Sequence, residues 1–548
     1  MIGLVASLRV LLLVAAVRFG APFTDGVVLQ RGREVPVWGR SDPKEKVTVR
    51  FADQVRTTEA DAQGRWRVDL DPLDTSMTGR ILSASTDMSD FLVEVRDVLV
   101  GEVWIASGQS NMECPLWCSQ EHRRDMDGAL MAQMTVRPHV RMTKVGRAFS
   151  RDPQCEAARP VKWLKVVPEE MEIDGRWLPS AIAYYFAVGL ADELNAPVGI
   201  LDITWGGTDI DAWTPSSGYE GKEGFERERN WRYLDDKEWN DARQMHGPCG
   251  GAIQQPRVLW NGMVAPFVPM AIRGVVWYQG DQNMHDPAHY TAKMHALYDG
   301  WAKEFDMPNM PFVFAQLTGY DGYDSQFVAI QMAQEKFARE ERRSAIVMAC
   351  DRGNAYDCHP AEKSAIARRF LAQALSHYYG RTWLRADPPW LKEVRVDGNQ
   401  FVLSFENVRE FYQYHPDWSV ESGFEIRGKD GVWRHGLITN LLVRESAPYM
   451  SHGKIAGTKL AVFSPEVDEP IAIRYLHAAP WYGSVKNEMS VPLGPFYAEF
   501  SDDESRSLVR CPDDPQRSRS RPCRPKNRTV QSGSACPSSW SDSEATHH

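Results

Sequence analysis

The chain has 548 residues, enough for about three or four domains of ordinary size. Its hydrophobic fraction of 43% and charged fraction of 25% are typical of a soluble globular protein. The formal net charge of -10 argues against nucleic-acid binding, which needs a concentrated basic face. The nine cysteines do not form two pairs at zinc spacing, so no metal site is predicted.

Residues 10–17 (VLLLVAAV) form a short apolar run that follows Arg9. Such a run is the minimum for a signal-peptide core and is far too short to span a bilayer. It also continues directly into a stretch with the pattern of a strand and turn. Residues 1–17 are therefore either a cleaved signal, which implies a secreted or periplasmic protein, or a first strand, which leaves a cytoplasmic location open. No membrane insertion is predicted.

Residues 18–97 are predicted to form an N-terminal β module, because short alternating or β-branched runs are separated by turn residues. Residues 390–500 return to short strands joined by Asp-Gly turns and predict a second β module. The Ser/Arg/Pro-rich tail, 501–548, has almost no apolar periodicity and is predicted to be disordered.

Residues 98–389, between the two β modules, alternate strands with helices, which indicates an α/β domain with a parallel sheet. Ligands bind outside the carboxyl ends of the strands in such sheets. Several of these strands end in glycine and polar residues, where a site is expected. The predicted strands are 103–107, 198–204, 271–278, 311–317 and 344–349, and the predicted helices are 180–195, 289–305, 326–341 and 361–378.

Ser110 follows the first of these strands in the stretch Gly108-Gln109-Ser110. A serine just past a strand end can present its hydroxyl to a crevice, with its own N–H free to donate to an oxyanion. Position 112 is Met, so the sequence does not fit the G-x-S-x-G elbow of α/β-hydrolases. Taken alone, Ser110 fits a helix cap as well as a nucleophile.

Asp357 and His359 follow the strand at 344–349. A serine nucleophile needs an imidazole base, and the imidazole needs an acid that fixes its tautomer. The sequence therefore suggests His359 as base and Asp357 as acid, although a plain surface loop would have the same pattern. A neutral histidine is required, so activity should fall below a pH near ~6.5, adjusted by the acid partner.

Two further strand ends offer hydrogen-bond donors for an oxyanion. The glycine pair 206–207 allows close backbone approach to a ligand, and Gln279 or Asn283 could supply a side-chain amide. A tight turn and structural amides are the alternatives. The order of serine, glycine, amide and Asp-His along successive strand ends favours a hydrolase.

The sequence resembles the sialate O-acetylesterase family of SGNH-type hydrolases. The matching stretches include GEVWIASGQSNMECPL (101–116), PVGILDITWGGTDIDAW (197–213), AIRGVVWYQGDQN (271–283) and DCHPAEKSAIARR (357–369). The resemblance covers residues of about 20–500. It implies a flavodoxin-like, three-layer SGNH hydrolase domain with flanking all-β modules. It also implies hydrolysis of O-acetyl esters on sialic acid or related carbohydrates, with no cofactor and no metal.

The resemblance assigns Ser110 as nucleophile, His359 as base and Asp357 as acid. The Ser110 N–H, Gly207 and either Gln279 or Asn283 would form the oxyanion hole. Gln109, Trp205 and Tyr278 are expected to contact the substrate, an O-acetylated carbohydrate.

Three positions differ from the family pattern. Position 281 is Asp where Glu is usual, position 358 is Cys where Ile is usual, and acid and base are two residues apart rather than three. Either Asp357 or Asp281 could therefore orient His359. The other functions considered are an acetylesterase of xylan or pectin, a non-catalytic carbohydrate-binding protein, and a hydrolase that uses Cys358.

Overall fold

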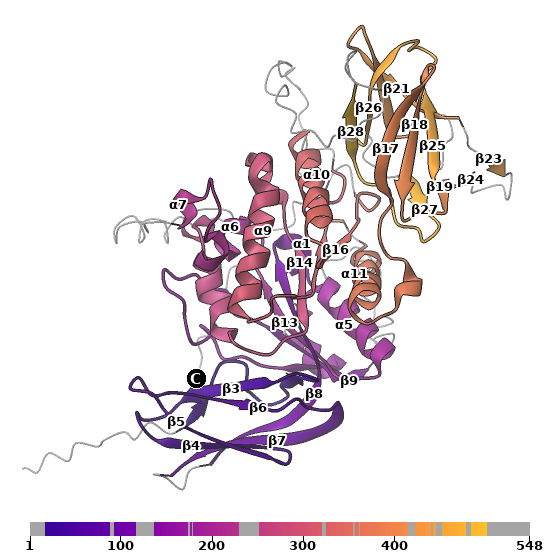
Figure 1. The fold of residues 1–548 in the computed structure, drawn as a ribbon. Coiled ribbons are helices and arrows are strands. Elements are labelled where there is room, and N and C mark those ends of the chain that lie inside the picture. Colours follow the sequence, from indigo (N-terminus) through magenta and orange to yellow (C-terminus); the bar gives the residue numbers. More distant parts are fainter. Residues whose placement is uncertain are drawn as a thin grey trace, which may run out of the picture.

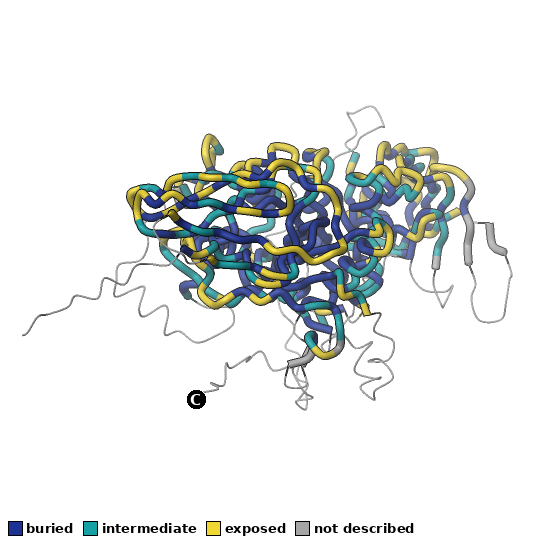
Figure 2. The backbone as a smooth tube through the Cα atoms, turned by 90° about the horizontal axis from the view of Figure 1, so that it is seen from below, coloured by how far each residue is buried: buried dark blue, intermediate teal, exposed yellow. Residues whose placement is uncertain are grey.

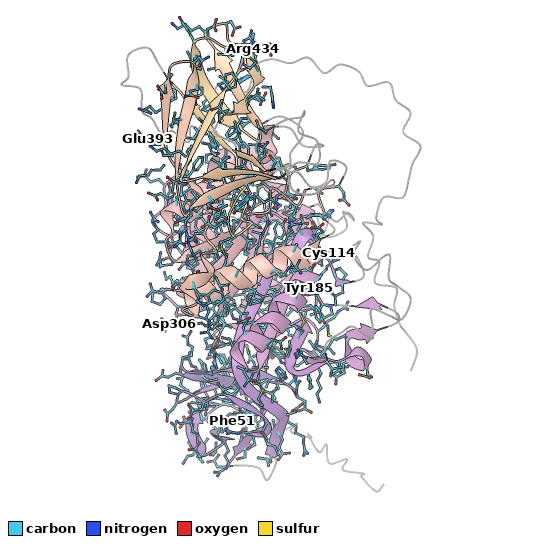
Figure 3. All side chains as sticks on the ribbon, turned by 90° about the vertical axis from the view of Figure 1, so that its right-hand side faces the viewer. Phe51, Cys114, Tyr185, Asp306, Glu393 and Arg434 are labelled. Carbon is cyan, nitrogen blue, oxygen red and sulfur yellow. The ribbon has the colours of Figure 1, made fainter. Side chains whose placement is uncertain are left out.

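The computed structural model describes most of the chain between residues 17 and 500. The described residues are 17–87, 92–116, 136–173, 176–177, 179–229, 251–320, 325–353, 357–360, 362–414, 422–439, 442–444, 452–477 and 484–500. Three parts follow one another along the long axis: an N-terminal β module, an α/β domain and a C-terminal β module (Figure 1). Phe51 lies near one end and Arg434 near the other (Figure 3). Nearly all of the apolar run at 10–17, and the tail 501–548, lie outside the described residues.

The N-terminal module consists of strands whose residues alternate between core and solvent. In β6, for example, Trp66, Val68 and Leu70 are buried and the residues between them are exposed, as the period of a strand requires. Its strands are β1 (Arg18–Phe19), β2 (Val28–Gln30), β3 (Val35–Arg40), β4 (Lys46–Phe51), β5 (Gln54–Glu59), β6 (Arg65–Leu70) and β7 (Ser76–Thr86).

One long strand, β8 (Leu92–Gly108), joins this module to the α/β domain. Its first half pairs with β7 and β2, and its second half pairs with β13 (Val198–Thr204) and β14 (Gly274–Tyr278). The predicted boundary between residues 97 and 98 thus falls inside a strand. A shared strand, rather than a linker, fixes the module against the domain.

The central sheet has the strand order β10-β9-β13-β8-β14-β15-β16. All neighbours pair in parallel except β10 and β9. Every residue of β13, β14, β15 and β16 is buried, as expected for a parallel sheet covered on both faces; Figure 2 shows this buried centre in dark blue. The remaining strands are β9 (Arg137–Lys144), β10 (Leu164–Val166), β15 (Phe312–Ala315) and β16 (Ser344–Val347).

Two pairs of helices pack in this domain. Helix α5 (Ala181–Leu194) packs on α11 (Lys363–Tyr378), and α9 (Pro287–Glu304) packs on α10 (Ser325–Glu340). A Cβ on Gly189 would lie 2.5 Å from the Leu371 side chain, so glycine permits the close approach of α5 and α11. Within the described residues, no helix has both the length and the apolar character to cross a membrane.

The shorter segments of the domain connect these elements. They are α1 (Ser110–Glu113), α4 (Pro168–Met171), β11 (Glu172–Ile173), β12 (Arg176–Trp177), α6 (Ile210–Trp213), η2 (Ser216–Tyr219), α7 (Glu226–Arg229), η3 (Gly251–Gln254), η4 (Trp260–Val264), η5 (Ala265–Phe267), η6 (Asp281–His285) and η7 (Thr382–Leu384).

The C-terminal module has its own apolar core, built around residues such as Phe401, Phe424 and Tyr475. Its strands are β17 (Trp390–Asp397), β18 (Gln400–Glu406), β19 (Glu410–Tyr414), β20 (Phe424–Gly428), β21 (Trp433–His435), β22 (Leu437–Ile438), β23 (Leu442–Arg444), β24 (His452–Ala456), β25 (Lys459–Phe463), β26 (Pro470–Tyr475), β27 (Val485–Asn487) and β28 (Phe496–Glu499).

A buried ion cluster ties this module to the loop after β16. The Asp351 carboxylate accepts hydrogen bonds from both ends of the Arg369 guanidinium at 2.6 and 2.7 Å, and lies 2.7 Å from Lys486 Nζ. The Asp351 side chain is 2% exposed. Burial alone would raise the pKa of Asp351, but Arg369 and Lys486 lower it to about 2. The cluster holds the beginning of the loop that later carries Asp357 and His359.

We expect Asp351→Asn to destabilise the chain by about 3–5 kcal/mol, because it leaves two buried cations without their counter-charge. The lowered pKa means that this stabilisation is present above pH ~4 and is lost as the pH falls toward 2. Urea titration monitored by tryptophan fluorescence measures the loss. Asp387→Asn, which removes an exposed carboxylate paired with His377, is the control and should change little. Equal stability of the two variants would contradict the role of the cluster.

Candidate active site

The end of strand β8 determines where Ser110 lies. Gly108 has φ +132°, and a Cβ there would lie 2.2 Å from the Tyr278 carbonyl oxygen, so the position requires glycine. The Gln109 N–H donates to the same oxygen at 3.0 Å. The chain then turns into α1, with Gln109 at the cap position and Ser110 as the first helical residue. The Ser110 hydroxyl is therefore not used as a helix cap.

Ser110, His359 and Asp357 form a chain of hydrogen bonds. His359 Nε2 lies 2.8 Å from Ser110 Oγ, and His359 Nδ1 lies 3.1 Å from Asp357 Oδ1. The His359 backbone N–H also donates to Asp357 Oδ1 at 2.8 Å, which fixes the carboxylate. The His359 side chain is 43% exposed and that of Asp357 is 46% exposed, so solvent reaches the group. This arrangement can transfer a proton from the serine hydroxyl to the imidazole.

The imidazole is held toward its protonated form in the free chain. Burial lowers the pKa of His359, but the hydrogen bond with Asp357 and the Cys358 sulfur outweigh burial and raise it to about 10. The hydrogen bond with His359 lowers the pKa of Asp357, against the effect of burial. The two groups therefore form an ion pair at neutral pH, and the neutral base becomes more abundant as the pH rises.

Asp281 lies close to this group but does not hydrogen-bond to it. It is the first residue of η6, is almost completely buried, and has no hydrogen-bond partner for either carboxylate oxygen among the described residues. Burial raises its pKa, and the nearby charge of His359 opposes that shift. Of the two acids that the sequence left open, Asp357 is the one that contacts the imidazole.

His359 and the two residues before it could also hold a metal ion. Asp357, Cys358 and His359 offer a carboxylate, a thiol and an imidazole whose ligand atoms lie within 4.8 Å of one another. Zinc accepts all three types of ligand. Metal bound there would occupy the imidazole and so prevent activation of Ser110.

A buried polar chain connects the serine segment to the histidine segment. Lys363 Nζ donates to Asn111 Oδ1 at 2.7 Å, and Asn111 Nδ2 donates to the Cys358 carbonyl at 3.1 Å. Lys363 is 1% exposed, and burial lowers its pKa. Because Asn111 and Cys358 are the neighbours of Ser110 and His359, these bonds fix the distance between nucleophile and base.

The amides of Asn283 and Gln279 have different roles. Gln279 Nε2 donates to the Thr208 carbonyl at 3.0 Å and to Asn283 Oδ1 at 2.7 Å, which uses both of its hydrogens. Asn283 Oδ1 also accepts from the Ile210 N–H at 2.9 Å, while Asn283 Nδ2 is buried without a partner among the described residues. Gln279 therefore orients Asn283. Of the two amides that the sequence left open, Asn283 is the one whose donor has no partner among the described residues.

The two glycines after β13 also differ. The Gly206 N–H donates to Glu113 Oε2 at 2.6 Å, and a Cβ on Gly206 would lie 3.3 Å from Ser110 Cβ. The other oxygen of Glu113 accepts from Arg147 at 2.7 Å. Gly207 has φ +67°, and no acceptor for its N–H is found in the described part of the chain. Gly207 is therefore the glycine with a backbone donor to offer.

Two of the three expected substrate contacts are inside the protein. Gln109 is 2% exposed, and its Oε1 accepts from the Gly280 and Gln282 N–H groups at 3.1 and 3.3 Å. Tyr278 is 0% exposed, as part of the fully buried β14. Neither can contact a sugar, which corrects the expectation for both. Trp205 is half-buried, and the Arg147 guanidinium lies 5.3 Å from its ring centroid. It lies directly before Gly206, beside the serine.

Comparison with known protein families and sequences identifies carbohydrate acetylesterases as relatives of this chain. The model of a carbohydrate esterase family, the sialic acid-specific acetylesterases, matches residues 100–377. The sialate O-acetylesterase of Homo sapiens is 27% identical over an alignment of 440 residues, and the match covers 75% of this chain and 79% of that protein. The corresponding protein of Mus musculus is 26% identical, and the match covers 72% of this chain and 79% of that protein.

Among solved structures, a carbohydrate acetylesterase from Xanthomonas citri is similar with a TM-score of 0.72 and 27% identity. The match covers 88% of this chain and 99% of that chain, so both β modules share in the likeness. The family model spans the whole region from β8 to α11, with Ser110, Asp357 and His359 inside it. This chain therefore belongs to the carbohydrate esterase family of sialic acid-specific acetylesterases, and it is an esterase.

Proposed function

We propose that the chain is a serine esterase that removes O-acetyl groups from sialic acid or a related carbohydrate through an acyl-enzyme. The observation that supports this most strongly is the continuous hydrogen-bonded chain from Ser110 Oγ through His359 to Asp357. The names of the family model and of the curated relatives support the choice of an acetylated sugar as substrate.

In the first step Ser110 Oγ attacks the acetyl carbonyl carbon while His359 Nε2 takes the hydroxyl proton. The C–O bond to the sugar breaks, and His359 gives that proton to the departing sugar oxygen. Water then enters, loses a proton to His359 and attacks the acetyl-serine. The bond to Ser110 Oγ breaks, His359 returns the proton to that oxygen, and acetate leaves. Asp357 stabilises the imidazolium in both steps through its 3.1 Å contact with Nδ1.

The negative oxygen of each tetrahedral intermediate needs donors that are already in place. We assign this role to the N–H of Ser110, the N–H of Gly207 and Asn283 Nδ2. The N–H of Ser110 belongs to the first turn of a helix and has no intrahelical acceptor. Asn283 Nδ2 is buried and without a described partner, and the bonds to Asn283 Oδ1 determine its direction.

We also infer that the α/β domain is flavodoxin-like. The strands β8, β13, β14, β15 and β16, numbered in chain order, are arranged 2-1-3-4-5 in the sheet, the order of flavodoxin. Strand β9 extends this order at one edge. The helix pairs α5/α11 and α9/α10 would form the two outer layers around the sheet (Figure 1).

We expect Ser110→Ala to reduce turnover of 4-nitrophenyl acetate by about 10³ or more, because the nucleophile is removed. Release of 4-nitrophenolate measures the change. The control is Ser217→Ala, which removes a hydroxyl bonded to Glu304. Ser180→Ala is unsuitable because Ser180 caps α5. Equal turnover of Ser110→Ala and wild type would contradict the role of Ser110 as nucleophile. Acetate release from O-acetylated sialic acid and from acetylated xylan by the wild type then separates the two substrate classes.

Asn283→Ala should lower kcat by about 10²–10³, the usual effect of removing one oxyanion donor. Gln279→Leu should have a smaller effect on kcat, because it removes a bond that orients Asn283 and leaves the donor itself in place. Steady-state kinetics on 4-nitrophenyl acetate compares the two, with circular dichroism as a check on folding. A greater loss in Gln279→Leu than in Asn283→Ala, with both variants folded, would return the donor role to Gln279.

Because the pKa of His359 is raised, we expect kcat/KM to increase with pH over the neutral and basic range. Only neutral His359 accepts the serine proton, so kcat/KM should rise with pH until the pH passes the pKa of about 10. Cys358→Ala removes a group that raises this pKa, so its profile should shift to lower pH and its kcat/KM at pH 7 should increase. Cys155→Ala, which removes an exposed thiol outside the active site, should leave the profile unchanged. Identical profiles for wild type and Cys358→Ala would show that the sulfur does not act on the base.

A further inference from the structure

A cavity lies between the N-terminal module and the α/β domain, apart from the candidate active site. Its volume is about 1030 Å³, which is ample for an oligosaccharide. One wall comes from β1, β3 and β6, and the other from the segment 152–161 together with residues near Trp260. None of Ser110, Asp357 and His359 lines it. We call this cavity the module cleft.

Two tryptophans in the module cleft pack so closely against glycines that no larger residue would fit there. A Cβ on Gly20 would lie 2.4 Å from Trp38 Nε1, and a Cβ on Gly39 would lie 2.5 Å from the Trp66 ring. Trp66 is 3% exposed, and its Nε1 is buried without a hydrogen-bond partner among the described residues. A buried indole N–H normally has an acceptor, so Trp66 leaves an unsatisfied donor in the wall of the cleft. An aromatic surface with such a donor suits a sugar ring and its hydroxyls.

The cleft is also more basic than the rest of the chain. Six arginines and four carboxylates line it, although the whole chain has a net charge of -10. Arg18 and Arg40 share a single carboxylate, that of Glu156, at 2.5 and 3.5 Å. The lining charged residues are Arg18, Arg40, Arg65, Arg67, Arg159 and Arg257, with Asp61, Asp152, Glu156 and Glu304. Arg65 and Arg67 already have carboxylate partners, in Asp61 and Asp69. The excess of guanidinium groups is therefore at the Arg18–Arg40 pair, and it favours a ligand with a carboxylate.

We propose that the module cleft binds an acidic saccharide at a site separate from Ser110. The half-buried Trp38 would contact the sugar face, and the Arg18–Arg40 pair would bind the carboxylate. The inference rests on the proposed function only for the expectation that the acidic sugar is a sialic acid. A second site would keep a glycan on the enzyme and raise the effective concentration of its other sugars at the catalytic centre.

Two cysteines allow both sites to be measured in one experiment. Cys155 lines the cleft, is exposed, and accepts a hydrogen bond from Arg40 at 3.0 Å, whereas Cys358 adjoins His359. The wild-type full chain is treated with limiting iodoacetamide, with and without sialyllactose. Peptide mass spectrometry gives the alkylation rate of each cysteine. Lactose, the same saccharide without the acidic sugar, is the matched ligand control.

We expect sialyllactose at about ten times its Kd to slow Cys155 alkylation about tenfold, because only the free fraction reacts. Lactose should have little effect. An unchanged Cys155 rate would overturn the proposal, whether or not Cys358 slows. Equal protection by lactose would overturn the role of the arginines. A chain that releases no acetate but shows Cys155 protection would refute the proposed function and leave this inference standing.

Arg18→Gln/Arg40→Gln should need at least about tenfold more sialyllactose for the same protection, because hydrogen bonds to charged groups are lost. Arg395→Gln, which removes an exposed guanidinium of the C-terminal module, should not change it. Turnover of 4-nitrophenyl acetate should remain that of wild type in both variants. Lower turnover in the Arg18/Arg40 variant would place these residues in the catalytic machinery and overturn the separation of the two sites.

Discussion

The contact between Gly108 and the Tyr278 carbonyl is the constraint on which the active site depends. Strands β8 and β14 pair up to this point, and the absence of a side chain at Gly108 lets the chain turn sharply into α1. The turn leaves Ser110 at the carboxyl end of the sheet, where the loops after β13, β14 and β16 also end. Any larger residue would displace α1 and with it the 2.8 Å contact to His359. Figure 3 shows the position of Cys114, directly after α1, well away from Phe51 in the N-terminal module.

Around this turn, buried polar side chains hold the catalytic loops through bonds that water cannot replace. An unpaired buried polar group costs about 1–3 kcal/mol, so each such bond resists displacement. Lys363 and Asn111 hold the His359 loop, Gln109 holds the turn after β14, and Gln279 holds Asn283. Rigid support of this kind keeps the side chains of the candidate active site at fixed distances from one another.

The sequence predicted the strand ends, and the positions of Ser110, Asp357 and His359 after them, because both depend on local signals. Apolar strands followed by glycine and polar residues predict where a parallel sheet carries its site, and the alternating helices were predicted to within a few residues. It failed for Gln109 and Tyr278, because nearness along the chain to a catalytic residue does not determine which way a side chain points. The buried role of Lys363 could not be predicted from the sequence, since a lysine in a helix normally faces solvent. The choice between Gln279 and Asn283 depends on partners that come from Thr208 and Ile210, about seventy residues away.

One segment of the α/β domain touches both the active site and the module cleft. Arg147 binds Glu113, which holds the glycine turn beside Ser110, and eight residues later Cys155 contacts Arg40 in the cleft. Even a fully extended chain of that length spans at most about 3.3–3.6 Å per residue, or roughly 30 Å in all. The separation of these two points is therefore at most roughly 30 Å, which is within reach of an oligosaccharide. Binding in the cleft would therefore act by tethering an extended glycan, and a short acetylated monosaccharide should gain nothing from it.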